Sequence, residues 1–179
     1  MNNSQSDQPN EIEAFSLEQL PEPILIQAAV GSLVMNLSYV HFVLEINLWS
    51  LLGINQNSGR VLTEDLPFKS LMQRFMRTIQ LKNPSTQVSD RLKKAFSQLD
   101  RVNAKRNKIV HGFWTFPEGA APLLIPKKGP VTQEIAPTLT KLADLNGEID
   151  RFLQEFFACM TLFNNPHLET LPLPEGTPR

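Results

Sequence analysis

The residues with the clearest chemical potential lie close together near position 110. Arg106, Asn107 and His111 occur within the segment Arg-Asn-Lys-Ile-Val-His. A histidine that titrates near neutrality can move a proton, and an arginine is a permanent cation that can stabilise a phosphate as its negative charge grows. RNA cleavage by its own 2′-hydroxyl needs these groups when no metal helps. The segment therefore predicts a metal-independent ribonuclease, with His111 as general acid or base, Arg106 contacting phosphate and Asn107 orienting the histidine or a phosphate oxygen.

The helix that carries this segment is expected to start near residues 85–89, to continue to His111 and to end before Gly112. At about 100° per residue, Arg106 lies in the middle of the apolar stripe of this helix. The stripe consists of Leu92, Ala95, Leu99, Val102, Ile109 and Val110. The polar flank beside it consists of Asp100, Asn103, Asn107 and His111. A charge on an apolar stripe must be paired, lie at a subunit interface or serve a site.

The number of histidines suggests how the site could be completed. Cleavage needs both an acid and a base, and the motif supplies only His111. Pairing of the apolar stripe with its own copy across a two-fold axis would place two of each residue in one cleft. It would also explain why Arg106 lies on the stripe. The sequence therefore predicts a homodimer, with single-stranded RNA as the substrate.

Three further polar residues could support the site. His41 and Glu45 lie four residues apart, so they share one face of the first helix. They are expected either to satisfy each other as an internal polar pair or to face the motif as a supporting acid or base. Asn103 could assist from the polar flank of the motif helix.

The segment after the motif offers weaker candidates for contact with RNA. Lys127 and Lys128 could guide a phosphate backbone, and Trp114 could stack on a base, as could Phe113 and Phe116. The alternative for each of them is structural. In that case the lysines are solvated and the aromatic rings pack a hairpin onto the helices.

Metals and cofactors are not predicted. The chain has no His and Cys set with zinc spacing, no paired Glu-x-x-His motifs and no Gly-rich phosphate loop. Its single cysteine, Cys159, lies in an apolar run and is expected to be a buried structural thiol. The net charge of -1 gives no bulk attraction to nucleic acid, so any contact with RNA must be local.

The chain of 179 residues is expected to form one all-α domain. The expected architecture is an antiparallel bundle of four main helices, with a short β-hairpin or irregular insertion between helices three and four. The expected helices are 21–52, 66–82, a third that starts near residues 85–89 and continues to 111, and 136–163. A loop is expected at 55–63 and hairpin strands at 113–116 and 123–125. Residues 1–20 are expected to be a disordered tail, 21–165 the bundle and 166–179 an irregular Pro-rich tail.

The first helix is apolar on nearly all sides, and residues 24–35 alone resemble a membrane span. Asn36, His41 and Glu45 fall where a span would have to continue, so a buried central helix is predicted. The first nine residues have neither the basic nor the apolar region of a signal peptide. A cytoplasmic protein without membrane contact is expected.

Residues 106–111 resemble the signature of HEPN domains, which is an arginine, a polar residue, three variable residues and a histidine. The following Gly-Phe-Trp, residues 112–114, is also common in that family. The resemblance implies a bundle of four or more helices that dimerises around the motif and acts as a metal-independent endoribonuclease. Such proteins often serve as toxins, with an antitoxin protein as partner, or in antiviral defence. The resemblance covers residues 22–164 and assigns Arg106, Asn107 and His111 to the site.

Two alternatives stay open at this point. The chain could be a catalytically inactive HEPN-like dimer that binds a nucleotide or a protein. Alternatively, Arg106 could be a snorkelling or interface residue, and His111 could be favoured only by the dipole at the end of its helix.

Overall fold

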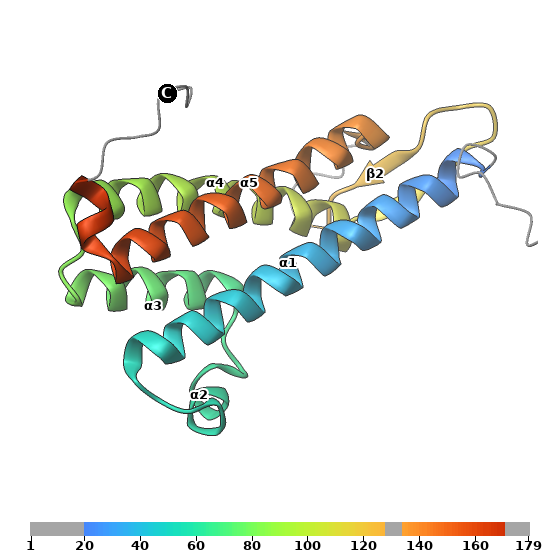
Figure 1. Ribbon diagram of the computed structural model, residues 1–179. Coiled ribbons are helices and arrows are strands. Elements are labelled where there is room, and N and C mark those ends of the chain that lie inside the picture. The colour runs from blue at the N-terminus through green and yellow to red at the C-terminus, as the bar shows by residue number, and fades with distance from the viewer. Residues whose placement is uncertain (1–19, 128–133, 171–179) are drawn as a thin grey trace, which may run out of the picture.

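The computed structural model describes residues 20–127 and 134–170. The predicted all-α bundle, with a small hairpin between its third and fourth main helices, is confirmed (Figure 1). The elements are α1 (Glu22–Leu52), α2 (Gln56–Thr63), α3 (Phe68–Leu81), α4 (Thr86–His111), β1 (Phe113–Thr115), β2 (Leu123–Ile125), β3 (Glu134–Ile135), α5 (Leu139–Asn164) and the 3-10 helix η2 (Pro166–Thr170).

The main helices end where their capping residues stand. Gly53 ends α1 in the left-handed conformation, with φ of 67°, which glycine adopts without a steric penalty. Ser85 caps the start of α4 by accepting a hydrogen bond from the amide of Val88, and Thr138 caps α5 in the same way. These caps explain why the predicted boundaries of α1 and α4 agree closely with the observed ones.

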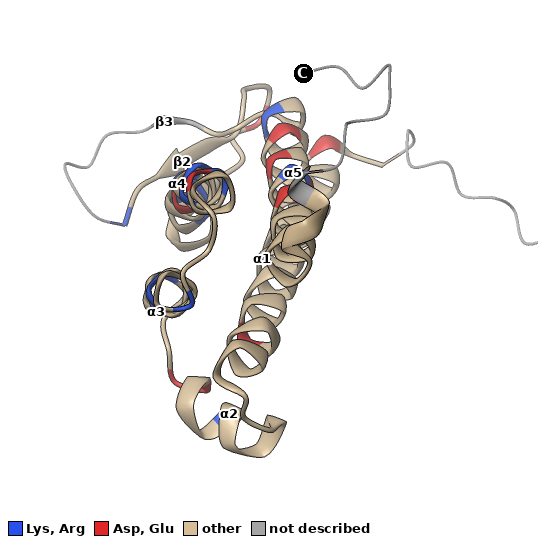
Figure 2. Cartoon of the chain, turned by 60° about the vertical axis from the view of Figure 1, so that its left-hand side comes forward, with Lys and Arg blue, Asp and Glu red and all other residues tan. Residues whose placement is uncertain are grey.

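The core lies where α5 packs against both α1 and α4, with α3 covering the other side. Figure 2 shows α3 and α4 nearly end-on beside α1 and α5. Four phenylalanines form the centre of the core, with neighbouring ring centroids 5.3 to 5.7 Å apart. They are Phe75 of α3, Phe96 of α4, and Phe152 and Phe156 of α5. One contiguous core therefore holds all four main helices together.

Helix α2 corrects the loop expected at residues 55–63. The side chain of Asn55 caps this helix by accepting a hydrogen bond from the amide of Ser58. Gly59 lies directly against the ring of Trp49, where a Cβ would clash, and Trp49 Nε1 donates to Thr63 Oγ1 at 3.3 Å. Asn55 and Gly59 suggested a loop, but they cap the helix and make room for the Trp49 ring.

The insertion is a three-stranded antiparallel sheet rather than a simple hairpin. Strand β1 pairs with β2, with Phe113 opposite Ile125, and β2 pairs with β3. The last main helix consequently begins at Leu139, because residues 134 and 135 belong to β3. Trp114 Nε1 donates to the carbonyl of Ile109 at 2.8 Å, which ties the sheet to the end of α4.

The sequence predicted an irregular tail from residue 166, and this prediction is wrong for the first five residues of that tail. They form η2, which packs against α5. The other expected tail segments, residues 1–19 and 171–179, lie outside the described residues.

Helix α1 is long and apolar enough to cross a membrane, judged by length and composition alone. Only 22% of its most apolar window is buried. Within the bundle, Asn36 of α1 donates to the side chain of Asn146 in α5 at 2.8 Å. The central helix expected from the sequence is therefore buried on one side, whereas another side of it stays exposed.

Candidate functional site

The apolar stripe of α4 is buried inside the chain. Of its residues, Leu92, Ala95, Leu99, Val102 and Ile109 are buried and belong to the core cluster, and Val110 is half-buried. The stripe therefore cannot pair with its copy across a two-fold axis, as the sequence suggested, because α1 and α5 already cover it. Any dimer must use a different surface.

Arg106 is half-buried beside this core. Its Nη1 donates to Asn107 Oδ1 at 3.0 Å, so two of the predicted site residues contact each other. Its Nε is buried and has no hydrogen-bond partner among the described residues. An unsatisfied buried donor costs free energy, and at a functional site a bound ligand is one way to satisfy it.

A cavity of about 230 Å³ lies between α1 and α4, with Arg106 in its wall. The lining residues are Leu37, Ser38, His41, Phe68, Asn103 and Arg106. The structure thus brings together Arg106 and two of the three supporting residues predicted from the sequence, His41 and Asn103. An arginine, an imidazole, an amide and a hydroxyl line the cavity. Ser38 Oγ donates to the carbonyl of Val34, and both ring nitrogens of His41 face protein acceptors, so Arg106 and Asn103 are the candidates to donate to a phosphate oxygen.

The third supporting residue, Glu45, holds His41. Glu45 Oε2 lies 3.6 Å from His41 Nδ1, which confirms the predicted polar pair. The other ring nitrogen, Nε2, lies 3.3 Å from the carbonyl oxygen of Leu66, and the ring stacks on Phe68 with 5.8 Å between centroids. The imidazole is therefore held in one orientation at the cavity wall, as an acid or base requires.

His111 lies apart from this cavity. It is the last residue of α4 and is exposed, and no polar partner for it is found in the two described ranges. Five residues along a helix correspond to a rotation of about 140°, so His111 and Arg106 project in different directions. One chain therefore brings Arg106 together with Asn103 and His41, but not with His111.

Of the residues predicted to contact RNA, Trp114 and Phe116 have structural roles. Trp114 is half-buried, donates to Ile109 and stacks on Phe116 with 6.2 Å between centroids, as the structural alternative predicts. Phe113, in contrast, is 67% exposed and free to stack. Lys127 is exposed, and Lys128 lies outside the described residues.

Lysines beside the motif were not identified from the sequence. Lys105 and Lys108 line a second cavity, of about 410 Å³, together with Lys141 from α5. Asp144 and Glu148 line it too, and Lys105 Nζ lies 4.0 Å from Glu148 Oε1, so its charges partly cancel. No spacing within α4 could reveal this cavity, because its other wall comes from α5 and the sheet.

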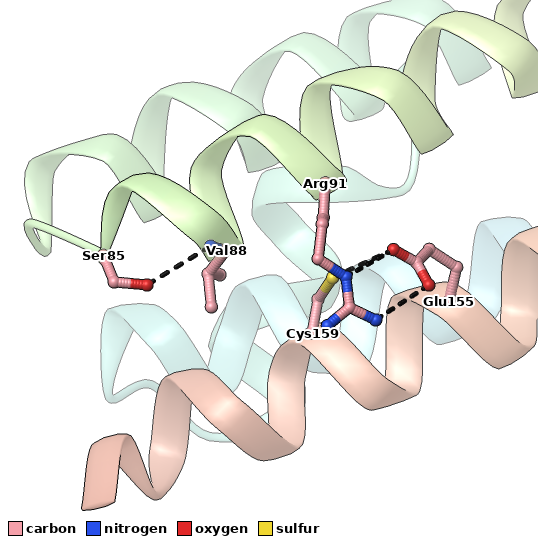
Figure 3. A network of polar contacts seen from close by, with 5 residues as sticks. All are labelled: Ser85, Val88, Arg91, Glu155 and Cys159. Carbon is pink, nitrogen blue, oxygen red and sulfur yellow. Dashed lines mark hydrogen bonds and ion pairs between the residues drawn. The ribbon is translucent and has the colours of Figure 1, made fainter. Parts of the chain in front are cut away.

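A second polar cluster, which sequence reasoning also missed, joins α4 to α5 (Figure 3). Arg91 donates twice to Glu155, from Nε to Oε1 at 2.7 Å and from Nη2 to Oε2 at 2.9 Å. The Cys159 thiol lies 3.8 Å from Glu155 Oε1. Burial raises the pKa of Cys159 to about 11, so the thiol stays protonated, as expected of a structural cysteine. This cluster acts as a clamp between helices, and nothing in the local sequence links residues 64 positions apart.

The clamp predicts a loss of stability in acid. The hydrogen bonds from Arg91 lower the pKa of Glu155 from its ordinary value of 4.5. A depressed pKa in the folded state means that the stabilisation is complete above about 4.5 and is lost as the pH falls through the folded-state pKa. Because the pair is partly exposed, its contribution is expected to be about 1 kcal/mol or less. Urea unfolding should show Glu155→Gln less stable than wild type at pH 7, with the difference shrinking as the pH falls below 4.5.

Metal-binding geometry is not evident in the part of the chain that the structure describes, where no group of three or more His, Cys, Asp or Glu side chains could hold an ion.

Comparison of the chain with models of known protein families found no match, and comparisons with curated proteins and with solved structures also found none.

Proposed function

We propose that the protein is a metal-independent endoribonuclease that holds a phosphate of single-stranded RNA at Arg106. The observation that carries the proposal is the buried, unpartnered Nε of Arg106 beside a cavity that also presents His41 and Asn103. A phosphate oxygen in that cavity would accept hydrogen bonds from the Arg106 guanidinium, and Nε would join them once the side chain turns to expose it. It would also place the fixed positive charge where negative charge develops during cleavage.

The reaction is transesterification within the RNA. A base takes the proton of the 2′-hydroxyl, the 2′-oxygen bonds to phosphorus, and the bond to the 5′-oxygen breaks as an acid protonates that leaving oxygen. The products are a 2′,3′-cyclic phosphate and a 5′-hydroxyl. His41 is one candidate for proton transfer, because it lies in the cavity wall with Arg106.

His111 is the second candidate. Since it projects away from the Arg106 of its own chain, the proposal includes a homodimer in which His111 of the partner subunit completes the cleft. Toxin activity and an antitoxin partner follow only from the family resemblance and are part of this proposal. The cytoplasmic location expected from the sequence is also part of it.

The test is cleavage of a fluorescent single-stranded RNA by the full chain in EDTA. We expect products that end in a 2′,3′-cyclic phosphate and a loss of at least 100-fold in rate for His111→Ala, which is within the range of general acid-base catalysis. His167→Ala is the matched control. His167 lies in η2, which follows α5 in the chain, so the rate of RNA cleavage by this variant should be unchanged. Cleavage that requires a divalent metal, or that persists in His111→Ala, would overturn the assignment.

A second candidate function is binding of a nucleotide or a protein without turnover. The exposed position of His111, away from the Arg106 cavity, favours it. In that case the same RNA would bind with an affinity that depends on Arg106, and no cyclic phosphate would form over days.

A further inference from the structure

Helix α1 carries an exposed stripe that the bundle leaves uncovered. We name it the α1 seam. It consists of Ile24, Ala28, Gly31, Met35, Tyr39, Phe42 and Ile46, all of which are exposed. Spacings of four and three residues keep them on one side of the helix, over about 33 Å at 1.5 Å per residue. The seam contains no charged group, and Figure 2 shows few charged residues anywhere on α1.

The order of the seam residues is symmetric about Met35. The successive spacings are 4, 3, 4, 4, 3 and 4 residues, which read the same in both directions. In an isologous pair, a contact from one residue to another is repeated with the roles exchanged. A two-fold axis at Met35 would therefore pair two antiparallel copies of the seam in register along its whole length.

The side chains are complementary in size under that pairing. Gly31 would face the partner's Tyr39, and Ala28 would face the partner's Phe42, so each aromatic ring meets a small residue. Ile24 would face the partner's Ile46. A parallel pairing would instead oppose Phe42 to Phe42 and leave Gly31 opposite Gly31. Interfaces pack as densely as protein interiors, so the antiparallel pairing is favoured.

Gly31 supports the same conclusion. A Cβ added there would meet nothing within 4 Å, so the fold of this chain does not require glycine at this position. Glycine in a helix interior also lowers helix stability relative to alanine. Packing within the chain therefore does not account for this glycine, and it lies opposite the position where the partner's Tyr39 would approach.

We propose that two copies of this chain associate through the α1 seam, antiparallel and with the two-fold axis at Met35. Taking about 200 Å² for a fully exposed large side chain, the seam offers roughly 500 Å² of apolar area per copy. Burial on both copies reaches about 1,000 Å², the lower limit for a specific interface. The seam has no charge that would repel its copy.

A membrane surface is the competing occupant, because α1 is apolar enough to enter a bilayer. Helices that lie on membranes carry Lys and Arg on their polar face, and α1 contains neither. The seam is also a narrow stripe, of the kind that packs against another helix. These two features favour a second copy.

The interface adjoins the candidate site. Ser38 and His41 lie beside the seam and line the Arg106 cavity. In the antiparallel register, residues 29–32 of the partner would lie at the same height along the helix axis as these two residues. The inference deepens the homodimer of the proposed function and rests on that part of it. The two can fail separately, because a dimer that cleaves no RNA leaves the seam standing, whereas a cleaving monomer removes the seam and the homodimer but leaves the ribonuclease activity.

Cysteine cross-linking of the full chain tests the register. Met35→Cys would meet its own copy across the axis and is expected to form a disulfide dimer at least tenfold faster than Ile24→Cys under a mild oxidant. In the antiparallel pair the two Ile24→Cys thiols lie at opposite ends of the seam, beyond disulfide reach. The wild-type chain should not cross-link, since Cys159 is buried.

Equal cross-linking of both variants would show a parallel pair and overturn the proposal. Absence of cross-linking, together with sedimentation as a monomer or binding to vesicles of phosphatidylcholine and phosphatidylglycerol, would overturn it too. Gly31→Leu gives an independent check, because it should keep the fold and raise the dimer dissociation constant at least tenfold. Gln154→Leu, which adds the same side chain on the exposed side of α5, should leave the dissociation constant unchanged.

Discussion

Replacement of Arg106 with methionine is expected to lower the rate of RNA cleavage by about 100- to 1,000-fold, the usual cost of losing one group that stabilises transition-state charge. The free energy of unfolding should not fall. Arg106 makes one hydrogen bond, to the exposed side chain of Asn107, while its buried Nε has no partner among the described residues. Methionine keeps most of the aliphatic stem and removes the unsatisfied donor, so the folded state should be unchanged or stabilised by up to about 1 kcal/mol.

The measurement combines single-turnover cleavage in EDTA with urea unfolding of the same samples. Arg101→Met is the matched control, because Arg101 is exposed on the same helix and contacts neither cavity. It should keep both activity and stability. If Arg106→Met kept full activity, or lost stability by several kcal/mol, then Arg106 would be a structural residue and the ribonuclease proposal would lose its main support.

The sequence predicted the fold best where local signals agreed. The end of helix α4 at His111 was predicted correctly, and its start lies within the predicted range of residues 85–89, because its apolar positions recur with helical spacing between a serine cap and Gly112. Helix α2 could not be predicted, because a helix of eight residues is stable only through packing, and the contact that forms it joins Gly59 to Trp49 in another helix. Strand β3 was missed for a similar reason, since a strand of two residues has no periodicity to read.

In the candidate site, too, the sequence predicted what depends on one helix and missed what depends on contacts between helices. The position of Arg106 beside an apolar surface followed from angles along one helix, and so did its closeness to Asn103. The meeting of Arg106 with His41 depends on where α1 crosses α4, which no local pattern encodes. The buried stripe of α4 was mistaken for a dimer surface because hydrophobic spacing shows that a face is covered, and does not show whether its own chain or a second chain covers it.

A large loss of stability is expected from Phe156→Ala. Phe156 is fully buried, and its ring lies 5.3 Å from Phe75, 5.7 Å from Phe152 and 6.3 Å from Phe96, measured between centroids. Truncation would open a cavity where α3, α4 and α5 meet, and large-to-small changes of this kind cost about 3 to 5 kcal/mol. For a chain of this size, the melting temperature should fall by roughly 10 °C.

The adjacent residue supplies the control for that loss. Phe157 contacts the edge of Phe156 but is 44% exposed, so Phe157→Ala should cost about 1 kcal/mol or less. Calorimetry of both variants separates the two cases. Because Phe156 contacts neither the Arg106 cavity nor the α1 seam, Phe156→Ala should retain its RNA cleavage and its dimer at temperatures where it is still folded. A small loss for Phe156→Ala, comparable with that for Phe157→Ala, would mean that the aromatic cluster does not hold the helices together.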